Sequence, residues 1–193
     1  MLKKYVMGNW KLQGSLADNK ALIEGIRAEL PKLDARVGMV VCPVAPYIPQ
    51  VKELTAGSGI AVGAQDVSEF AKGAYTGEMA AGMLKDVGVE FVLVGHSERR
   101  SYHGENSAQI ARKAQAVIGA GLVPVVCIGE SLDERNAGQT KAVLTEQLDA
   151  LFAVVGTDNG NIVLAYEPRW AIGTGVSATT EQIADVHTFL RDY

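Results

Sequence analysis

The sequence is poor in cysteine and histidine, and it contains no apolar run of membrane-spanning length. Its two cysteines, Cys42 and Cys127, lie in apolar runs outside any Cys-x-x-Cys pair, so we expect both to be reduced and buried. The three histidines, His96, His103 and His187, are scattered and indicate no zinc site. No apolar signal-peptide segment follows the first lysines. We therefore predict a cytoplasmic protein with no membrane segment and no metal.

The sequence also has fewer positively charged than negatively charged residues. The chain has 18 Lys and Arg residues against 22 Asp and Glu residues, which gives a net charge of −4. Its basic residues form no stripe, so nucleic-acid binding has little support, and an anionic ligand would need locally placed cations. Hydrophobic residues make up 48% of the 193 positions, enough to bury a sizeable core. We predict a single domain over residues 1–193.

Short apolar runs alternate with amphipathic segments along the whole chain. The runs predict strands and the amphipathic segments predict helices, the last of them capped by Thr179 or Thr180. A turn is expected at Asn159-Gly160. The expected strands cover 5–11, 37–42, 60–65, 91–94, 122–128 and 161–166, and the expected helices cover 15–30, 47–54, 79–87, 107–120, 132–155 with a break at Gly138, and 180–193. This alternation predicts an α/β fold with a parallel sheet.

Two architectures satisfy this pattern, an open doubly wound sheet and a closed (β/α)8 barrel. Polar residues stand at the C-terminal ends of four expected strands; they are Asn9 with Lys11, Gln65, His96 and Glu167. Barrel enzymes build their sites from the ends of several strands, whereas an open sheet concentrates its ligand contacts at one switch point. The distribution therefore favours the barrel.

The sixth expected strand leads into Glu167, and Pro168 ends the strand because it cannot donate to a ladder. The apolar run before them predicts a strand buried on both faces. Trp170 and the glycines Gly173 and Gly175 then form a segment with an apolar body and a flexible end, as in an active-site lid. On spacing alone, Glu167 is either a helix-capping acid or a catalytic carboxylate.

Two other strand ends carry candidate catalytic side chains. Lys11 is either a solvated lysine or a cation that stabilises developing negative charge. His96 precedes Ser97, which could cap a short helix, so His96 is either a structural histidine or a neutral hydrogen-bond donor near a helix N-terminus. Together with Glu167, these residues suit proton abstraction beside a carbonyl, with the intermediate shielded from water by a lid.

Three other motifs have simpler explanations. Residues 173–178 match the dinucleotide pattern G-x-G-x-x-A, but they lie away from the strand end and in the sixth βα unit, so we interpret the match as coincidence. Cys127 lies in an apolar strand. Apolar surroundings raise the pKa of a thiol and make it inert, so we do not expect Cys127 to act as a nucleophile. Arg99 and Arg100 resemble phosphate binders, but the nearby acids Glu98, Glu105 and Glu130 favour a structural ion-pair network.

Three motifs resemble the signatures of the triosephosphate isomerase family. They are Asn9-Trp10-Lys11, Gly95-His96-Ser97-Glu98-Arg99, and Ala165-Tyr166-Glu167-Pro168 followed by Trp170-Ala171-Ile172-Gly173-Thr174-Gly175. The resemblance covers the chain from Tyr5 onward, in order and at matching spacing. It implies a TIM barrel and an isomerase of glycolysis and gluconeogenesis that needs no cofactor. Such an enzyme interconverts dihydroxyacetone phosphate and D-glyceraldehyde 3-phosphate by proton transfer through an enediolate.

The resemblance also assigns roles to residues. It implies that Glu167 is the catalytic base, that His96 is the electrophile, and that Lys11 contacts the substrate and its developing charge. Asn9 is implied to bind substrate beside Lys11, and Gly173 to offer a lid amide to the phosphate.

Supporting and assembly roles follow in the same way. Ser97 and Glu98 are implied to support the catalytic residues. Family members are typically homodimers, in which the loop corresponding to residues 66–78 enters the neighbouring subunit with Thr76 near its tip. A related barrel acting on another sugar phosphate is a further alternative, against which the combined Lys11, His96 and Glu167 motifs argue.

Two departures from the family pattern produce further expectations. Arg169 occupies a hinge position that is usually a small aliphatic residue, so we hypothesise that it alters lid closure. The chain stops at Tyr193 with about six of the eight βα units, and it contains no Tyr-Gly-Gly-Ser or Gly-Gly-Ala-Ser stretch. We therefore expect low activity, with a catalytically impaired folding or assembly unit as the alternative function.

Overall fold

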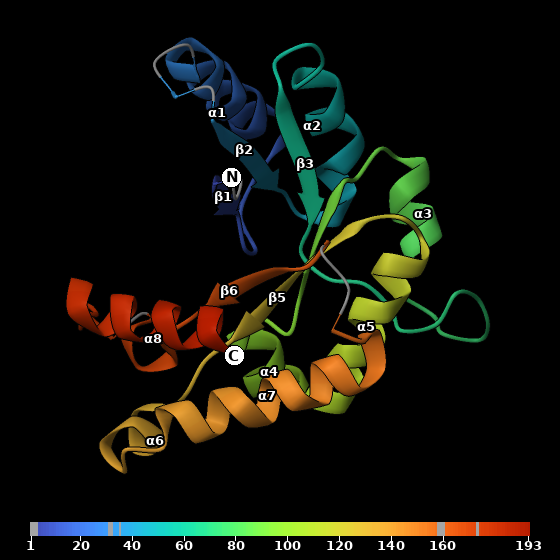
Figure 1. Ribbon diagram of the computed structural model, residues 1–193. Helices are drawn as coiled ribbons and strands as arrows, with labels where there is room; N and C mark the ends of the chain where they lie inside the picture. The colour runs from blue at the N-terminus through green and yellow to red at the C-terminus, as the bar shows by residue number, and fades with distance from the viewer. Residues whose placement is uncertain (1–3, 31–32, 35, 158–160, 173) are drawn as a thin grey trace. The chain divides into compact units, whose positions relative to one another are not determined.

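The computed structural model of the protein describes residues 4–30, 33–34, 36–157, 161–172 and 174–193, and Figure 1 labels its helices and strands. The chain divides into two compact units. The first contains Met1–Leu93 with Ala116–Pro124, and the second contains Val94–Gln115 with Val125–Tyr193. The chain passes between the units within β4 (Phe91–Val94), α5 (Ser107–Gly119) and β5 (Val123–Ile128).

The first unit is built on parallel strands that follow one another in sequence order, β1-β2-β3-β4. The other elements of this unit are β1 (Lys4–Asn9), α1 (Leu16–Glu29), β2 (Val37–Cys42), η2 (Ala45–Tyr47), α2 (Ile48–Leu54), β3 (Ile60–Ala64) and α3 (Ala81–Asp86). A doubly wound sheet reverses its strand order at a switch point, so the sequential order favours the barrel.

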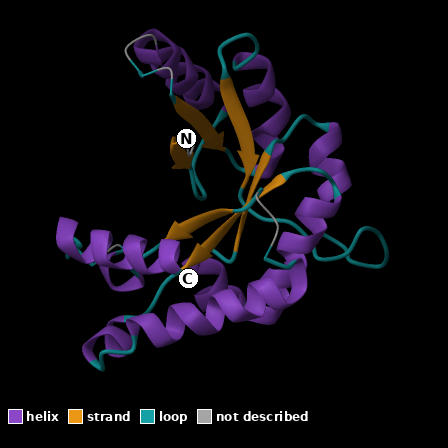
Figure 2. Cartoon of the chain, in the orientation of Figure 1, coloured by secondary structure: helices purple, strands orange, loops and turns teal. Residues whose placement is uncertain are grey.

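The second unit pairs β5 in parallel with β6 (Val163–Tyr166), with Ile128 opposite Tyr166. Its further elements are α4 (Ser97–His103), α6 (Leu132–Asn136), α7 (Thr140–Val155), η3 (Arg169–Ala171) and α8 (Thr180–Asp192). Figure 2 shows the alternation of strands and helices in both units, which confirms the predicted α/β class. Among the described residues, no helix is long and apolar enough to cross a bilayer.

The core is formed by the apolar runs that predicted strands. Val40, Val62 and Val92, from β2, β3 and β4, are fully buried, and Val125 of β5 is nearly so. Such runs are typical of parallel strands that are covered on both faces. The prediction that the sixth strand is buried on both faces was wrong, because the residues of β6 are half-buried. Within the described part of the chain, β5 is the one strand that pairs with β6, so the other edge of β6 lacks a strand neighbour.

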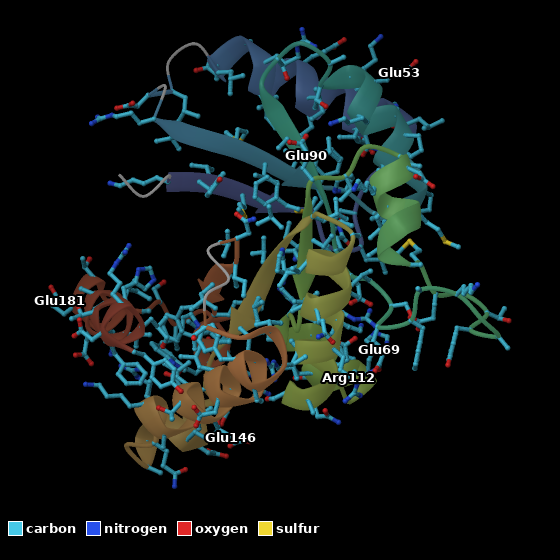
Figure 3. All side chains as sticks on the ribbon, turned by 45° about the vertical axis from the view of Figure 1, so that its right-hand side comes forward. Glu53, Glu69, Glu90, Arg112, Glu146 and Glu181 are labelled. Atoms are coloured by element: carbon cyan, nitrogen blue, oxygen red, sulfur yellow. The ribbon has the colours of Figure 1, made fainter. Side chains whose placement is uncertain are left out.

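Helix ends follow the capping chemistry expected from the sequence. Thr179 caps α8 in a reciprocal capping box with Gln182, and Figure 3 labels the exposed Glu181 in the first turn of that helix. The predicted break at Gly138 is confirmed, since this glycine has a φ of 69° between α6 and α7. The turn expected at Asn159-Gly160 lies outside the described residues.

Candidate active site

His96 and Glu167 meet in the second unit, although they are far apart in sequence. Ser97, the residue that follows His96, is separated from Glu167 by 70 positions. His96 follows the end of β4, and Glu167 directly follows β6. His96 Nε2 lies 3.1 Å from Glu167 Oε1, and the Ser97 backbone N–H donates to Glu167 Oε2 at 3.1 Å. The His96 side chain is 9% exposed and that of Glu167 is 19% exposed, so water screens their interaction only weakly.

The contacts of the imidazole define its tautomer. His96 Nδ1 accepts a hydrogen bond from the Glu98 backbone N–H at 3.2 Å, so Nδ1 carries no proton. Nε2 is therefore the ring nitrogen that can donate, and it faces Glu167 Oε1. The expected helix cap was wrong by one residue: His96 itself caps α4, and Ser97 is the first helical residue.

The backbone around Glu167 is held by the end of β5. The Glu167 N–H donates to Ile128 O at 2.7 Å. A Cβ atom at Gly129 would lie 1.8 Å from the carbonyl oxygen of Glu167, a distance that no side chain can occupy. Gly129 is therefore required for this close approach of two backbone segments. This role of Gly129 was not predicted, although a glycine directly after a buried strand is a signal for it.

A buried carboxylate, Glu130, anchors the base of the expected lid. Its side chain is 0% exposed and its Oε1 accepts from Trp170 Nε1 at 3.1 Å, Arg135 Nη1 at 3.1 Å and the Tyr166 hydroxyl at 3.0 Å. Burial, followed by the charge of Glu130, raises the pKa of Tyr166, so this hydroxyl stays protonated as a donor. Glu130, one of the three acids considered as partners for Arg99 and Arg100, forms its ion pair with Arg135.

The segment after Pro168 has the composition of a lid, and its first turn is held in place by burial and hydrogen bonding. Trp170, 7% exposed, is buried in η3, and the Thr174 hydroxyl donates to Trp170 O at 2.8 Å. Arg169 reaches α4, where its Nη2 lies 3.4 Å from Ser101 Oγ. Gly175 has a φ of 77°, a conformation that favours glycine. Gly173, the expected phosphate contact, lies outside the described residues.

The expected substrate contacts of the first unit lie at the end of β1, with Asn9 as its last residue and Lys11 two positions further on. The predicted strand extends two residues too far at its C-terminal end, because β1 ends at Asn9. Lys11 has a φ of 52°, which a non-glycine residue rarely adopts. Asn9 Oδ1 accepts from the Lys11 backbone N–H at 2.9 Å, and Gln65 Nε2 donates to Lys11 O and to Cys42 O, each at 2.9 Å. These bonds hold the lysine backbone in its strained conformation.

The loop expected to form an interface extends from the first unit. Its stem is closed by a hydrogen bond from Ser68 N–H to Met79 O at 2.8 Å. Phe70 and Tyr75 stack within it, with ring centroids 3.9 Å apart and planes at 3°. Thr76 follows this pair and is exposed. The loop therefore has an ordered aromatic body with Thr76 at its surface.

The two arginines of α4 behave differently. Arg99 pairs with the buried Glu105 at 2.5 Å, and Lys113 Nζ lies 2.6 Å from the same carboxylate oxygen, which confirms the structural ion pairs predicted for Arg99. These two cations lower the pKa of Glu105 against the opposing effect of burial, which is the largest single influence. The prediction was wrong for Arg100, whose hydrogen bonds go to the carbonyls of Gly95 and Cys127 and to the hydroxyl of Ser107.

Both cysteines are free and buried, as expected. Burial raises the pKa of the Cys42 thiol to about 12, so this thiol is unreactive at neutral pH. In the described ranges, no group of three or more His, Cys, Asp and Glu side chains could hold a metal ion.

The arrangement of the second unit suits acid–base chemistry on a small carbonyl compound. It places a carboxylate beside an imidazole nitrogen at the ends of two strands, directly before a lid-like segment. A family model described as triosephosphate isomerase matches residues 4–193.

Curated relatives with the same name are similar over nearly the whole chain. Triosephosphate isomerase of Cupriavidus taiwanensis is 53% identical over 192 residues, covering 99% of this chain and 77% of the relative. The protein of that name from Paracidovorax citrulli is 52% identical over 190 residues, covering 98% and 76% respectively. The one from Thiobacillus denitrificans is 50% identical over 192 residues, covering 99% and 76%.

Proposed function

The chain belongs to the triosephosphate isomerase family, and we propose that Glu167 and His96 perform its proton transfers. The activity is that of a triosephosphate isomerase, which interconverts dihydroxyacetone phosphate and D-glyceraldehyde 3-phosphate and belongs to glycolysis and gluconeogenesis. Family membership also confirms the TIM-barrel class over an open doubly wound sheet. The observation that supports our assignment is the 3.1 Å approach of His96 Nε2 to Glu167 Oε1.

Glu167 is the proposed base. Its carboxylate takes a proton from the carbon beside the substrate carbonyl, and the electron pair of that C–H bond forms the enediolate double bond. His96 Nε2–H donates to the carbonyl oxygen, where negative charge develops. The proton then returns to the neighbouring carbon while a second proton passes from the hydroxyl oxygen to the former carbonyl oxygen, which completes the isomerisation and restores the carboxylate of Glu167. In this structure the Ser97 N–H and His96 hold both carboxylate oxygens, so substrate binding has to release Glu167 from them.

Ser97 and Glu98 are proposed as supports rather than as reacting groups. The Ser97 N–H holds the resting carboxylate, and the Glu98 N–H occupies His96 Nδ1. The second contact keeps the donor proton on Nε2, which is the atom that has to face the substrate.

We propose that Lys11 and Asn9 bind the substrate, as the family resemblance implies. The strained backbone of Lys11, held by Asn9 and Gln65, is typical of a residue whose side chain direction matters for function. Its ammonium supplies the cation that an anionic phosphate requires in a chain with a net charge of −4. We also propose that the Gly173 amide binds the phosphate when the lid closes.

We propose that residues 1–193 belong to one barrel domain. Domain boundaries normally fall in exposed linkers, whereas the division between the two units cuts through β4, α5 and β5. We also propose a cytoplasmic location, in keeping with the reduced cysteines Cys42 and Cys127.

We propose a homodimer in which the loop 66–78 contacts the neighbouring subunit, with Thr76 near the contact. The exposed aromatic pair Phe70 and Tyr75 supports this assignment, since ordered aromatic side chains are enriched at interfaces. Light scattering after size exclusion tests it with Thr76→Arg, while Lys20→Glu on the exposed side of α1 is the control. A dimer that survives Thr76→Arg contradicts the placement of the interface.

A coupled assay of both reaction directions tests the activity on protein of verified mass and folded state. We expect turnover of dihydroxyacetone phosphate and no turnover of larger sugar phosphates, as for a triosephosphate isomerase. Folded protein that lacks isomerase turnover would contradict the assignment and support an assembly role.

A further inference from the structure

Arg100 is a partly buried cation that lies between the ends of two strands and hydrogen-bonds neutral groups. Its Nε donates to Gly95 O at 3.0 Å, Nη2 to Cys127 O at 3.1 Å, and Nη1 to Ser107 Oγ at 3.3 Å. Among the described residues, no carboxylate hydrogen-bonds this guanidinium. Burial lowers the pKa of Arg100, but a guanidinium remains charged at any physiological pH.

The first carbonyl that Arg100 holds belongs to the peptide that leads into His96. Gly95 has a φ of 70°, and a Cβ there would lie 2.7 Å from Ile110 Cδ1. The chain therefore makes a tight turn between β4 and His96 that only glycine fits. Arg100 fixes the plane of the Gly95–His96 peptide and with it the starting direction of the imidazole.

The second carbonyl lies beside the attachment point of Glu167. Cys127 precedes Ile128 on β5, and Ile128 O accepts the Glu167 N–H at 2.7 Å. A shift of the Cys127 peptide would therefore move the backbone bond that locates Glu167. The guanidinium is planar and rigid, so the two carbonyls that it binds are kept in a fixed relation.

We propose that Arg100 is a positioning residue for the isomerase reaction, setting the separation of His96 from Glu167 by binding the Gly95 and Cys127 carbonyls in one planar fork. This inference rests on the proposed roles of His96 and Glu167. A lysine cannot replace Arg100, because a single ammonium nitrogen cannot span the same acceptors in one plane. Arg100 touches no reacting atom and acts through the two residues that it aligns.

A purely structural role for Arg100 predicts a different result. If Arg100 only tied α4 to β5, its loss would lower stability and leave the turnover of the folded fraction unchanged. Arg99 provides the matched comparison, because it is the neighbouring arginine of the same helix and its described ion pair is with Glu105. Loss of Arg99 removes one of two cations from Glu105 and leaves the contacts of His96 and Glu167 in place.

The test compares Arg100→Lys and Arg100→Met with Arg99→Met by kinetics and by ¹⁵N NMR of the histidine side chains. We expect kcat to fall about 10- to 100-fold in both Arg100 variants with little change in KM, because small misplacements of catalytic groups slow chemistry by such factors. The His96 ring signals should shift, while those of His187 on α8 serve as the internal reference. Arg99→Met should keep kcat and the His96 signals near those of the wild type.

Two results would overturn the proposal. One is an Arg100→Lys protein with wild-type kcat and unchanged His96 signals. The other is an Arg100→Met protein whose kcat, corrected for the folded fraction, matches that of Arg99→Met. Should Arg100→Met fail to fold, Arg100→Lys decides, because it retains the charge. Glu167→Gln distinguishes failure of the proposed function from failure of the Arg100 proposal. If Glu167→Gln keeps full activity, the assignment of Glu167 as the base is wrong. The NMR comparison still reports whether Arg100 orients His96.

Discussion

The Nε2 atom of His96 lies 3.1 Å from Oε1 of Glu167, and the other oxygen of this carboxylate accepts the Ser97 N–H. This pairing joins the ends of β4 and β6, which are distant in sequence. It keeps the carboxylate in a defined position, and the Glu98 N–H occupies Nδ1, so Nε2 is the nitrogen of the imidazole that can donate. The proposed base and donor are therefore oriented before substrate binds.

Glu167→Gln should lower kcat by about 10²- to 10⁴-fold, the usual contribution of a positioned general base. Glutamine keeps the size and the acceptor oxygen of the side chain, so we expect KM and folding to change little. Steady-state assays in both directions measure the effect, and circular dichroism verifies the fold. Activity within a few-fold of the wild type would show that another group removes the proton.

His96→Asn should separate catalysis from helix capping. Asparagine is a good N-cap, so its side chain can replace Nδ1 as the acceptor for the Glu98 N–H, but it cannot reproduce the Nε2 donor. We expect kcat to fall about 10²-fold or more with nearly unchanged unfolding free energy. His96→Ala should lose the cap as well, which costs about 1 kcal/mol in urea unfolding. Equal stability of the two variants would contradict the capping role.

Gly129→Ala should impair both stability and activity. The new Cβ would lie 1.8 Å from the Glu167 carbonyl oxygen, so the backbone that carries the base has to move. Overpacking of this kind typically costs about 1–3 kcal/mol. Gly119→Ala is the matched control, because a Cβ at Gly119 on α5 meets no atom within 4 Å. Gly129→Ala protein with wild-type melting temperature and kcat would show that the predicted clash is relieved without displacing Glu167.

Arg169→Val should change kcat/KM if Arg169 influences lid closure, as its unusual place at the hinge suggests. In this structure its guanidinium reaches Ser101 on α4, a contact that valine cannot make. Ser101→Ala removes the acceptor alone and provides the comparison. Stopped-flow tryptophan fluorescence of Trp170 follows the lid, since this side chain lies beside Arg169 in η3. Kinetics that are unchanged in Arg169→Val would reject the hypothesis.

Cys42 should make stability decrease at alkaline pH. Burial raises the pKa of its thiol to about 12 in the folded protein, above the unfolded value of about 8.5. The neutral thiol therefore contributes stability that is complete below the unfolded pKa and is lost as pH rises toward the folded pKa. Urea unfolding between about pH 8 and 11 should show a steeper decline for the wild type than for Cys42→Ala. Parallel declines would mean that Cys42 is accessible to water.

The order and type of the elements were predictable from the sequence because they depend on local patterns. The strand 37–42 was predicted correctly from its apolar run, and the cap of α8 is Thr179, one of the two threonines that the capping pattern offered. Glu167 was identified as a strand-end carboxylate because Pro168 stops the ladder after it. The half-buried state of β6 was not predictable, because burial depends on neighbouring strands rather than on the composition of the strand itself.

The sequence by itself determined the family, the strand–helix alternation and the identity of the chemical groups at the strand ends. These follow from residue types at short spacings and from the three family motifs. Only the tertiary structure decided which groups meet. It joined His96 to Glu167, made Gly129 necessary to the backbone of the base, and directed Arg100 to two carbonyls instead of a carboxylate. These relations depend on distances between segments that are remote in sequence, and no local pattern encodes such distances.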